Sequence, residues 1–139
     1  MEDIRILMQK ASACKESRDI DGALSAYNDA FNILIERAAA YAREQESQVV
    51  DLQALRAMTP ALFAHSDEYL KRDLTAAIIL NEMGLLFQSQ KEYENAQQKF
   101  SEATRYIPDG EDFADPQQNY DAVTEIINTS IVSEPELFE

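Results

Sequence analysis

Residues that break helices or cross-link chains are scarce in this 139-residue sequence, which has three Gly, four Pro and one Cys. Because breakers are few and no segment alternates as a β-strand would, the sequence predicts an all-α protein of one domain. The single cysteine, Cys14, excludes an internal disulfide. We expect it to be a buried and inert thiol.

Basic residues are scarce as well. The sequence holds 12 Lys and Arg against 26 Asp and Glu, a formal net charge of -14, and residues 106–139 contain nine acidic residues and no basic one. A phosphate backbone or an anionic membrane surface needs a basic stripe, so neither nucleic acid nor membrane is an expected partner. The longest apolar run is too short to span a bilayer, and the acidic start Met1-Glu2-Asp3 does not resemble a signal peptide. We therefore expect a cytoplasmic protein.

Residue sets that usually carry catalysis or hold metals are missing too. His65, the only histidine, has no nucleophile motif near it, and no Gly-rich phosphate loop occurs. The acidic run from Asp109 to Asp115 lacks EF-hand spacing, which favours a solvated loop over a calcium site. The sequence therefore predicts a protein that is not an enzyme and needs no cofactor or metal. A catalytic site assembled from residues without a local motif is the alternative.

Residues 80–108 carry the most informative pattern. Small and large apolar residues follow the spacing of two antiparallel helices, namely Leu80, Met83, Gly84, Phe87, Tyr93, Ala96, Phe100, Ala103 and Pro108. Gly in a helix interior costs about 1 kcal/mol relative to Ala, so Gly84 indicates a close helix crossing. The pattern resembles one complete tetratricopeptide repeat (TPR), with Leu80 at the place of the usual Trp.

The same spacing occurs 73 residues earlier in the chain. Small and aromatic residues again stand at the packing positions, namely Ala11, Ala23, Tyr27 and Ala30. Lys10 departs from the pattern, and Ile35 stands where Pro108 closes the later unit, so the second helix of the earlier unit could run on. The resemblance implies a TPR-like α-α superhelix of antiparallel helix pairs.

The resemblance also implies a domain organisation. We expect one TPR-like domain over residues 1–132, with a repeat at 4–37, a diverged unit at 38–76, a second repeat at 77–110 and a capping helix at 116–131, followed by an acidic tail at 133–139. Residues 38–58 predict a long helix, and Thr59-Pro60 predicts a helix start. Ser66 predicts the start of another helix, from about Asp67 to Ser89. A long helical hairpin inserted between two repeats is the alternative to the diverged unit.

In TPR proteins the first helix of each pair lines a groove that receives a peptide or helix. The resemblance places eight residues there, Arg5, Met8, Ser12 and Lys15 in the earlier unit and Ile78, Asn81, Leu85 and Gln88 in the later one. Arg5 and Lys15 would favour ligands that carry carboxylates. For Ile78 and Leu85 the alternative is core packing against the middle unit or the capping helix.

The expected function is a non-enzymatic adaptor or scaffold module that binds a peptide or helix of a partner protein. The TPR subclass that clamps a chaperone's terminal carboxylate is disfavoured, because Met8, Ser12 and Glu82 stand at the clamp positions. A dedicated chaperone resembling the small TPR-type secretion chaperones is the main alternative, and a homodimer is left open. A further alternative takes the first 37 residues as similar to the microtubule-interacting and trafficking domain.

The acidic tail has two interpretations. Leu137 and Phe138 lie between carboxylates after Pro135, which ends any helix there. The tail either keeps the protein in solution or docks in a repeat groove, with its carboxylates facing Arg5 and Lys15.

Overall fold

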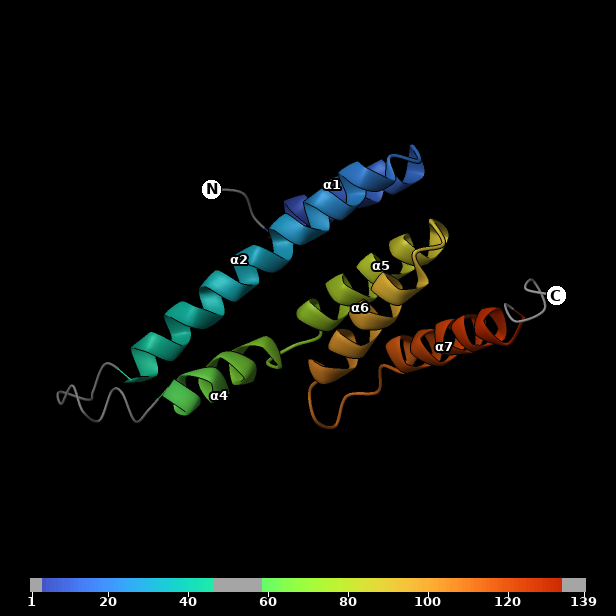
Figure 1. Ribbon diagram of the computed structural model, residues 1–139. Coiled ribbons are helices and arrows are strands. Elements are labelled where there is room, and N and C mark those ends of the chain that lie inside the picture. Colours follow the sequence, from blue (N-terminus) through green and yellow to red (C-terminus); the bar gives the residue numbers. More distant parts are fainter. Residues whose placement is uncertain (1–3, 47–58, 134–139) are drawn as a thin grey trace.

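The computed structural model describes residues 4–46 and 59–133, and every regular element within these ranges is an α-helix. The helices are α1 (Ile4–Glu16), α2 (Ile20–Glu46), α4 (Thr59–Leu70), α5 (Thr75–Ser89), α6 (Tyr93–Arg105) and α7 (Asp115–Ser133). The prediction of an all-α protein is confirmed. Figure 1 shows α1 and α2 on one side of the molecule, α5 and α6 in the middle and α7 on the other side, with α4 beside the end of α2.

Helix α5 packs directly against α2, and no described helix pair lies between the α1–α2 and α5–α6 hairpins. The helix predicted from residue 38 is the continuation of α2, which runs without a break to Glu46 and packs against α4. Helix α4 begins at Thr59, as predicted. The end of α2 and α4 therefore form a helix pair of their own.

The helix start predicted at Ser66 is wrong, because α4 passes through this residue and ends at Leu70. Ser is common at helix starts because its hydroxyl can accept a hydrogen bond from the first turn. Here the Ser66 hydroxyl instead donates to the carbonyl oxygen of Ala38 on α2, at 3.5 Å. A contact with another helix therefore replaces the predicted cap.

The continuous helix predicted from Asp67 to Ser89 is also wrong, since residues 71–74 separate α4 from α5. The backbone N–H of Thr75, the first residue of α5, donates a hydrogen bond to the carboxylate of Asp73 at 2.9 Å. A carboxylate in this position satisfies one of the unpaired N–H groups of a first helical turn and so favours a new start.

Both hairpins turn in the same way. Arg18 and Lys91, which are 73 residues apart, each have a φ of 64° in the left-handed region at the end of the first helix. In each turn the following residue donates a backbone hydrogen bond to the carbonyl five residues earlier, at 2.7 and 2.9 Å. This is the bonding of a Schellman helix end. The sequence repeat is therefore matched by a repeat of local backbone structure.

Helices α5 and α6 take part in two hydrophobic cores. The first joins α1, α2 and α5 and also includes Leu70 of α4 and Ala103 of α6. The second consists of residues of α6 and α7, with Leu85 and Phe87 of α5 packed against it. Small and aromatic residues of the repeat pattern are buried, namely Ala11, Ala23, Tyr27, Ala30, Gly84, Ala96, Phe100 and Ala103. Phe87 and Tyr93 are partly buried against the second core, Cys14 is partly buried against the first, and Pro108 is half-buried.

Candidate functional site

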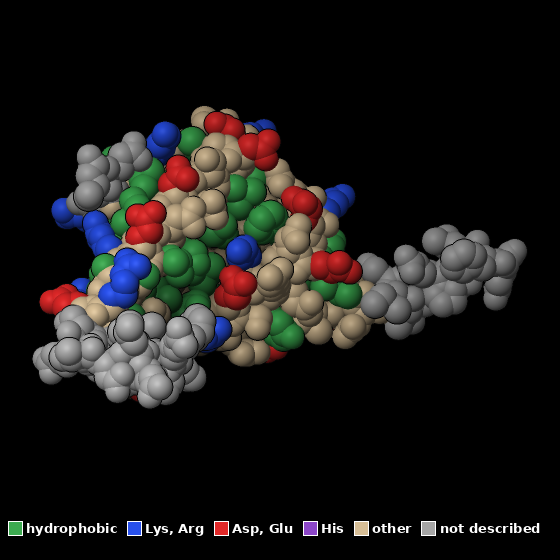
Figure 2. Space-filling view, turned by 60° about the vertical axis from the view of Figure 1, so that its left-hand side comes forward, with side chains coloured by type: hydrophobic (Ala, Val, Ile, Leu, Met, Phe, Trp, Pro, Cys, Tyr) green, Lys and Arg blue, Asp and Glu red, His purple; other side chains and the backbone are tan. Residues whose placement is uncertain are grey.

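A pocket of about 240 Å³ lies where α1, α2, α4 and α5 meet. Its apolar walls come from all four helices and include Ile4, Met8, Leu34, Leu70 and Ala76. Three exposed basic side chains also line it, Arg5 from α1, Arg37 from α2 and Arg72 from the turn before α5. We name it the arginine pocket. The face in Figure 2 carries basic side chains close to hydrophobic ones in the left half of the view.

The local structure positions two of these groups. The Arg72 guanidinium lies over the ring of Tyr69, with its carbon 4.8 Å from the ring centre, and both side chains line the pocket. Asp73 is the only acidic residue in the lining, and its carboxylate accepts the hydrogen bond from Thr75. Asp73 keeps its charge, so the lining carries three positively charged side chains and one negatively charged one.

Of the eight residues predicted to line a groove, Arg5 and Met8 belong to the arginine pocket. Ser12, farther along α1, is exposed. Arg37 and Arg72 were not predicted. The run Lys71-Arg72-Asp73 carried a usable signal, since charged residues seldom continue a helix that is apolar almost all round.

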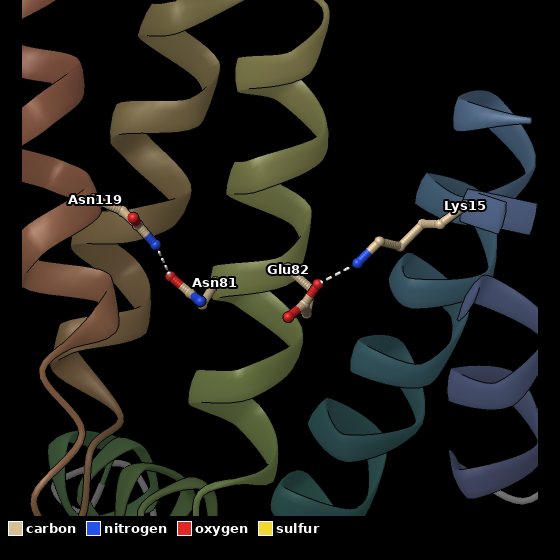
Figure 3. A network of polar contacts seen from close by, with 4 residues as sticks. All are labelled: Lys15, Asn81, Glu82 and Asn119. Carbon is tan, nitrogen blue, oxygen red and sulfur yellow. Dashed lines mark hydrogen bonds and ion pairs between the residues drawn. The ribbon is translucent and has the colours of Figure 1, made fainter. Parts of the chain in front are cut away.

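Lys15 already has a carboxylate partner inside the molecule. Its ammonium group donates a hydrogen bond to Oε2 of Glu82 on α5 at 2.6 Å (Figure 3). This bond to Glu82 raises the pKa of Lys15. The pair joins α1 to α5. Because Lys15 already pairs with Glu82, this geometry does not favour the predicted role of Lys15 in attracting a ligand's carboxylate.

Asn81 lies on the opposite side of α5 from Glu82 (Figure 3). Only 4% of its surface is exposed, and its side-chain oxygen accepts a hydrogen bond from the amide of Asn119 on α7 at 2.9 Å. Leu85 packs against the second core, Ile78 is half-buried, and Gln88 has a buried Oε1 atom without a hydrogen bond. Asn81 thus contacts α7, and Leu85 packs into a core that α6 and α7 share, which agrees with the core packing offered as its alternative.

The described residues hold no cluster of three His, Cys, Asp or Glu side chains that could bind a metal. His65 lies near Glu68, with Nδ1 and Oε2 3.4 Å apart, and its ring meets Tyr41 edge-on. No helix in the described ranges has both the length and the apolar character needed to cross a membrane. The predicted docking concerns the tail at residues 133–139. Ser133 is the last residue of α7, and residues 134–139 lie outside the described part.

Stability is expected to fall at alkaline pH. The bond to Glu82 raises the pKa of Lys15 above 10.5, and burial raises the pKa of Tyr27 and of Tyr106 above 10.0. Because these pKa values are higher in the folded state than in the unfolded state, the protonated groups stabilise the fold. This stabilisation is complete below about pH 10 and is lost as the pH rises through the folded-state pKa values. Thermal melts from pH 7 to 11.5 should show a falling Tm only above about pH 10. The Tm of the double variant Tyr27→Phe/Tyr106→Phe should fall less steeply with pH. An equal fall would contradict the assignment of this loss of stability to the two tyrosines.

Comparison of the chain with protein-family models, with curated proteins and with solved structures finds no match. The TPR-like interpretation therefore depends on the residues of the repeat pattern and on the matching turns of the two hairpins.

Proposed function

We propose that this chain is a non-enzymatic adaptor module of TPR-like architecture that binds a segment of a partner protein in the cytoplasm. The supporting observation is the position of the arginine pocket. The first helices of the two repeated hairpins, α1 and α5, both line it. Those are the helices that the resemblance assigns to ligand binding. The direct packing of α5 on α2 brings them to the same site, as consecutive repeats of a superhelix would.

Photo-crosslinking from two positions tests this proposal. A photoreactive residue at Ser12, which is exposed one turn beyond Met8 on α1, should form a discrete adduct with a partner protein in the native host. The same residue at Gln98, which is exposed on α6, is the matched control and should form no such adduct. Equal adducts from both positions, or none from Ser12, would contradict a binding site at this face.

The composition of the adducts separates the two functions. An adaptor should crosslink to proteins from assembled complexes, whereas a dedicated chaperone should crosslink to one partner that aggregates when the chain is removed.

A further inference from the structure

The arginine pocket is positively charged in a strongly acidic protein. The sequence has 12 Lys and Arg against 26 Asp and Glu, yet the lining contains three Arg and only Asp73 with negative charge. Asp73 is already hydrogen-bonded to the first turn of α5. The same turn places the positive end of the α5 dipole beside the pocket. The charge around the pocket therefore favours an anionic ligand, although the net charge of the whole chain is -14.

Two of the guanidinium groups are placed to bind carboxylates. The Arg72 guanidinium lies over the Tyr69 ring, an interaction that uses none of its N–H groups as donors to an oxygen, so these donors remain for a second group. Arg37 is exposed and has no ion-pair partner among the described residues. Because Arg37 belongs to α2 and Arg72 to the turn before α5, each can pair with a separate carboxylate at the pocket.

The size and the apolar walls of the pocket indicate which group a ligand would place inside it. A volume of about 240 Å³ is below the roughly 300–1,000 Å³ of typical small-molecule sites, but it accepts one large apolar side chain. Such a side chain would bury the aliphatic walls and gain free energy from their removal from water. A simple inorganic anion would not gain this burial. A phosphate backbone would need a basic stripe rather than an isolated pocket.

We propose that the arginine pocket binds a peptide segment of the partner in which one large apolar side chain lies between two acidic residues. The apolar side chain enters the pocket, and the carboxylates pair with Arg37 and Arg72, with Arg5 adding to the positive field. This inference rests on the proposed function, because it specifies what the binding module recognises.

Selection of random peptides displayed on phage tests the inference with the intact chain. Selected peptides should be enriched in Asp or Glu on both sides of Leu, Ile, Phe or Met. In fluorescence anisotropy, Arg37→Glu/Arg72→Glu should bind a selected peptide about tenfold more weakly or worse, with a smaller loss for Arg37→Gln/Arg72→Gln. Lys10→Glu/Arg43→Glu changes the net charge equally at exposed positions outside the pocket, and it should bind nearly as the unmodified chain does.

No enrichment, enrichment without acidic residues, or an equal loss in the control variant would overturn the inference. All variants alter exposed side chains, so thermal melts should confirm that each is folded. A partner that crosslinks at Ser12 through a segment without carboxylates would overturn the inference and leave the proposed function intact. Acidic peptides selected in vitro without any adduct in the host would contradict the proposed function alone.

Discussion

Gly84→Ala is expected to lower the free energy of unfolding by about 1–3 kcal/mol, although Ala is the better helix former by about 1 kcal/mol. A methyl group on Gly84 would collide with the ring of Phe100, whose Cδ1 atom would lie 2.6 Å away. Phe100 is fully buried and clusters with Ala96 and Val123 in the second core, so a shift of its ring would disturb the packing of α6 and α7. Gly84→Leu should be more severe. Urea denaturation followed by circular dichroism measures both changes.

Two further variants show whether the close crossing is the cause. Ala11 stands at the equivalent position of the first hairpin and is fully buried. Ala11→Gly is the matched control and should cost about 2 kcal/mol, of which about 1 kcal/mol comes from helix propensity and about 0.8 kcal/mol from the lost burial of the methyl group. In a Phe100→Leu background the collision is relieved, and Gly84→Ala should then stabilise the protein. The double-mutant cycle gives the coupling between the two positions. An equal loss from Gly84→Ala in both backgrounds would contradict the packing argument.

The hairpins and α7 were predictable because their signals are local. Gly84 and the small and aromatic residues of the repeat pattern recur at the spacing of two antiparallel helices, and this spacing indicates close crossings. Asp115-Pro116 marks the start of α7 in the same way. Each of these features can be read within one or two turns of helix.

The break before α5 and the arginine pocket were harder to predict. The charged run Lys71-Arg72-Asp73 is the one local signal for the break, and the pocket forms only when helices distant in the sequence pack together. Residues 71–74 contain no Gly or Pro, and apolar positions continue on both sides of them. At the break, the carboxylate of Asp73 accepts a hydrogen bond from the N–H of Thr75, and the Arg72 guanidinium lies over the ring of Tyr69. The residue types alone do not specify these side-chain contacts. Arg37 resembles any exposed Arg on a helix until α4 and α5 pack beside α2. Asn81, expected in the groove, is covered by α7 instead.

Val123→Asp is expected to detach α7 from the rest of the protein. Val123 is fully buried against Ala96 and Phe100 in the second core. Losing this burial costs about 1.5–3 kcal/mol, and a carboxylate there would also lose its hydration without gaining a partner. Hydrogen exchange should show that the amides of α7 lose protection. Light scattering should show self-association, because undocking exposes an apolar face of α5 and α6.

The extent of the opening decides whether α7 acts as a separable cap. The first core contains no residue of α7, so the amides of α1 and α2 should keep their protection in Val123→Asp. Ala122→Asp introduces the same charge at the exposed neighbouring position and should change neither protection nor association. If Val123→Asp opens α1 and α2 as much as α7, the described helices unfold as one cooperative unit, and α7 is an integral part of the core rather than a cap.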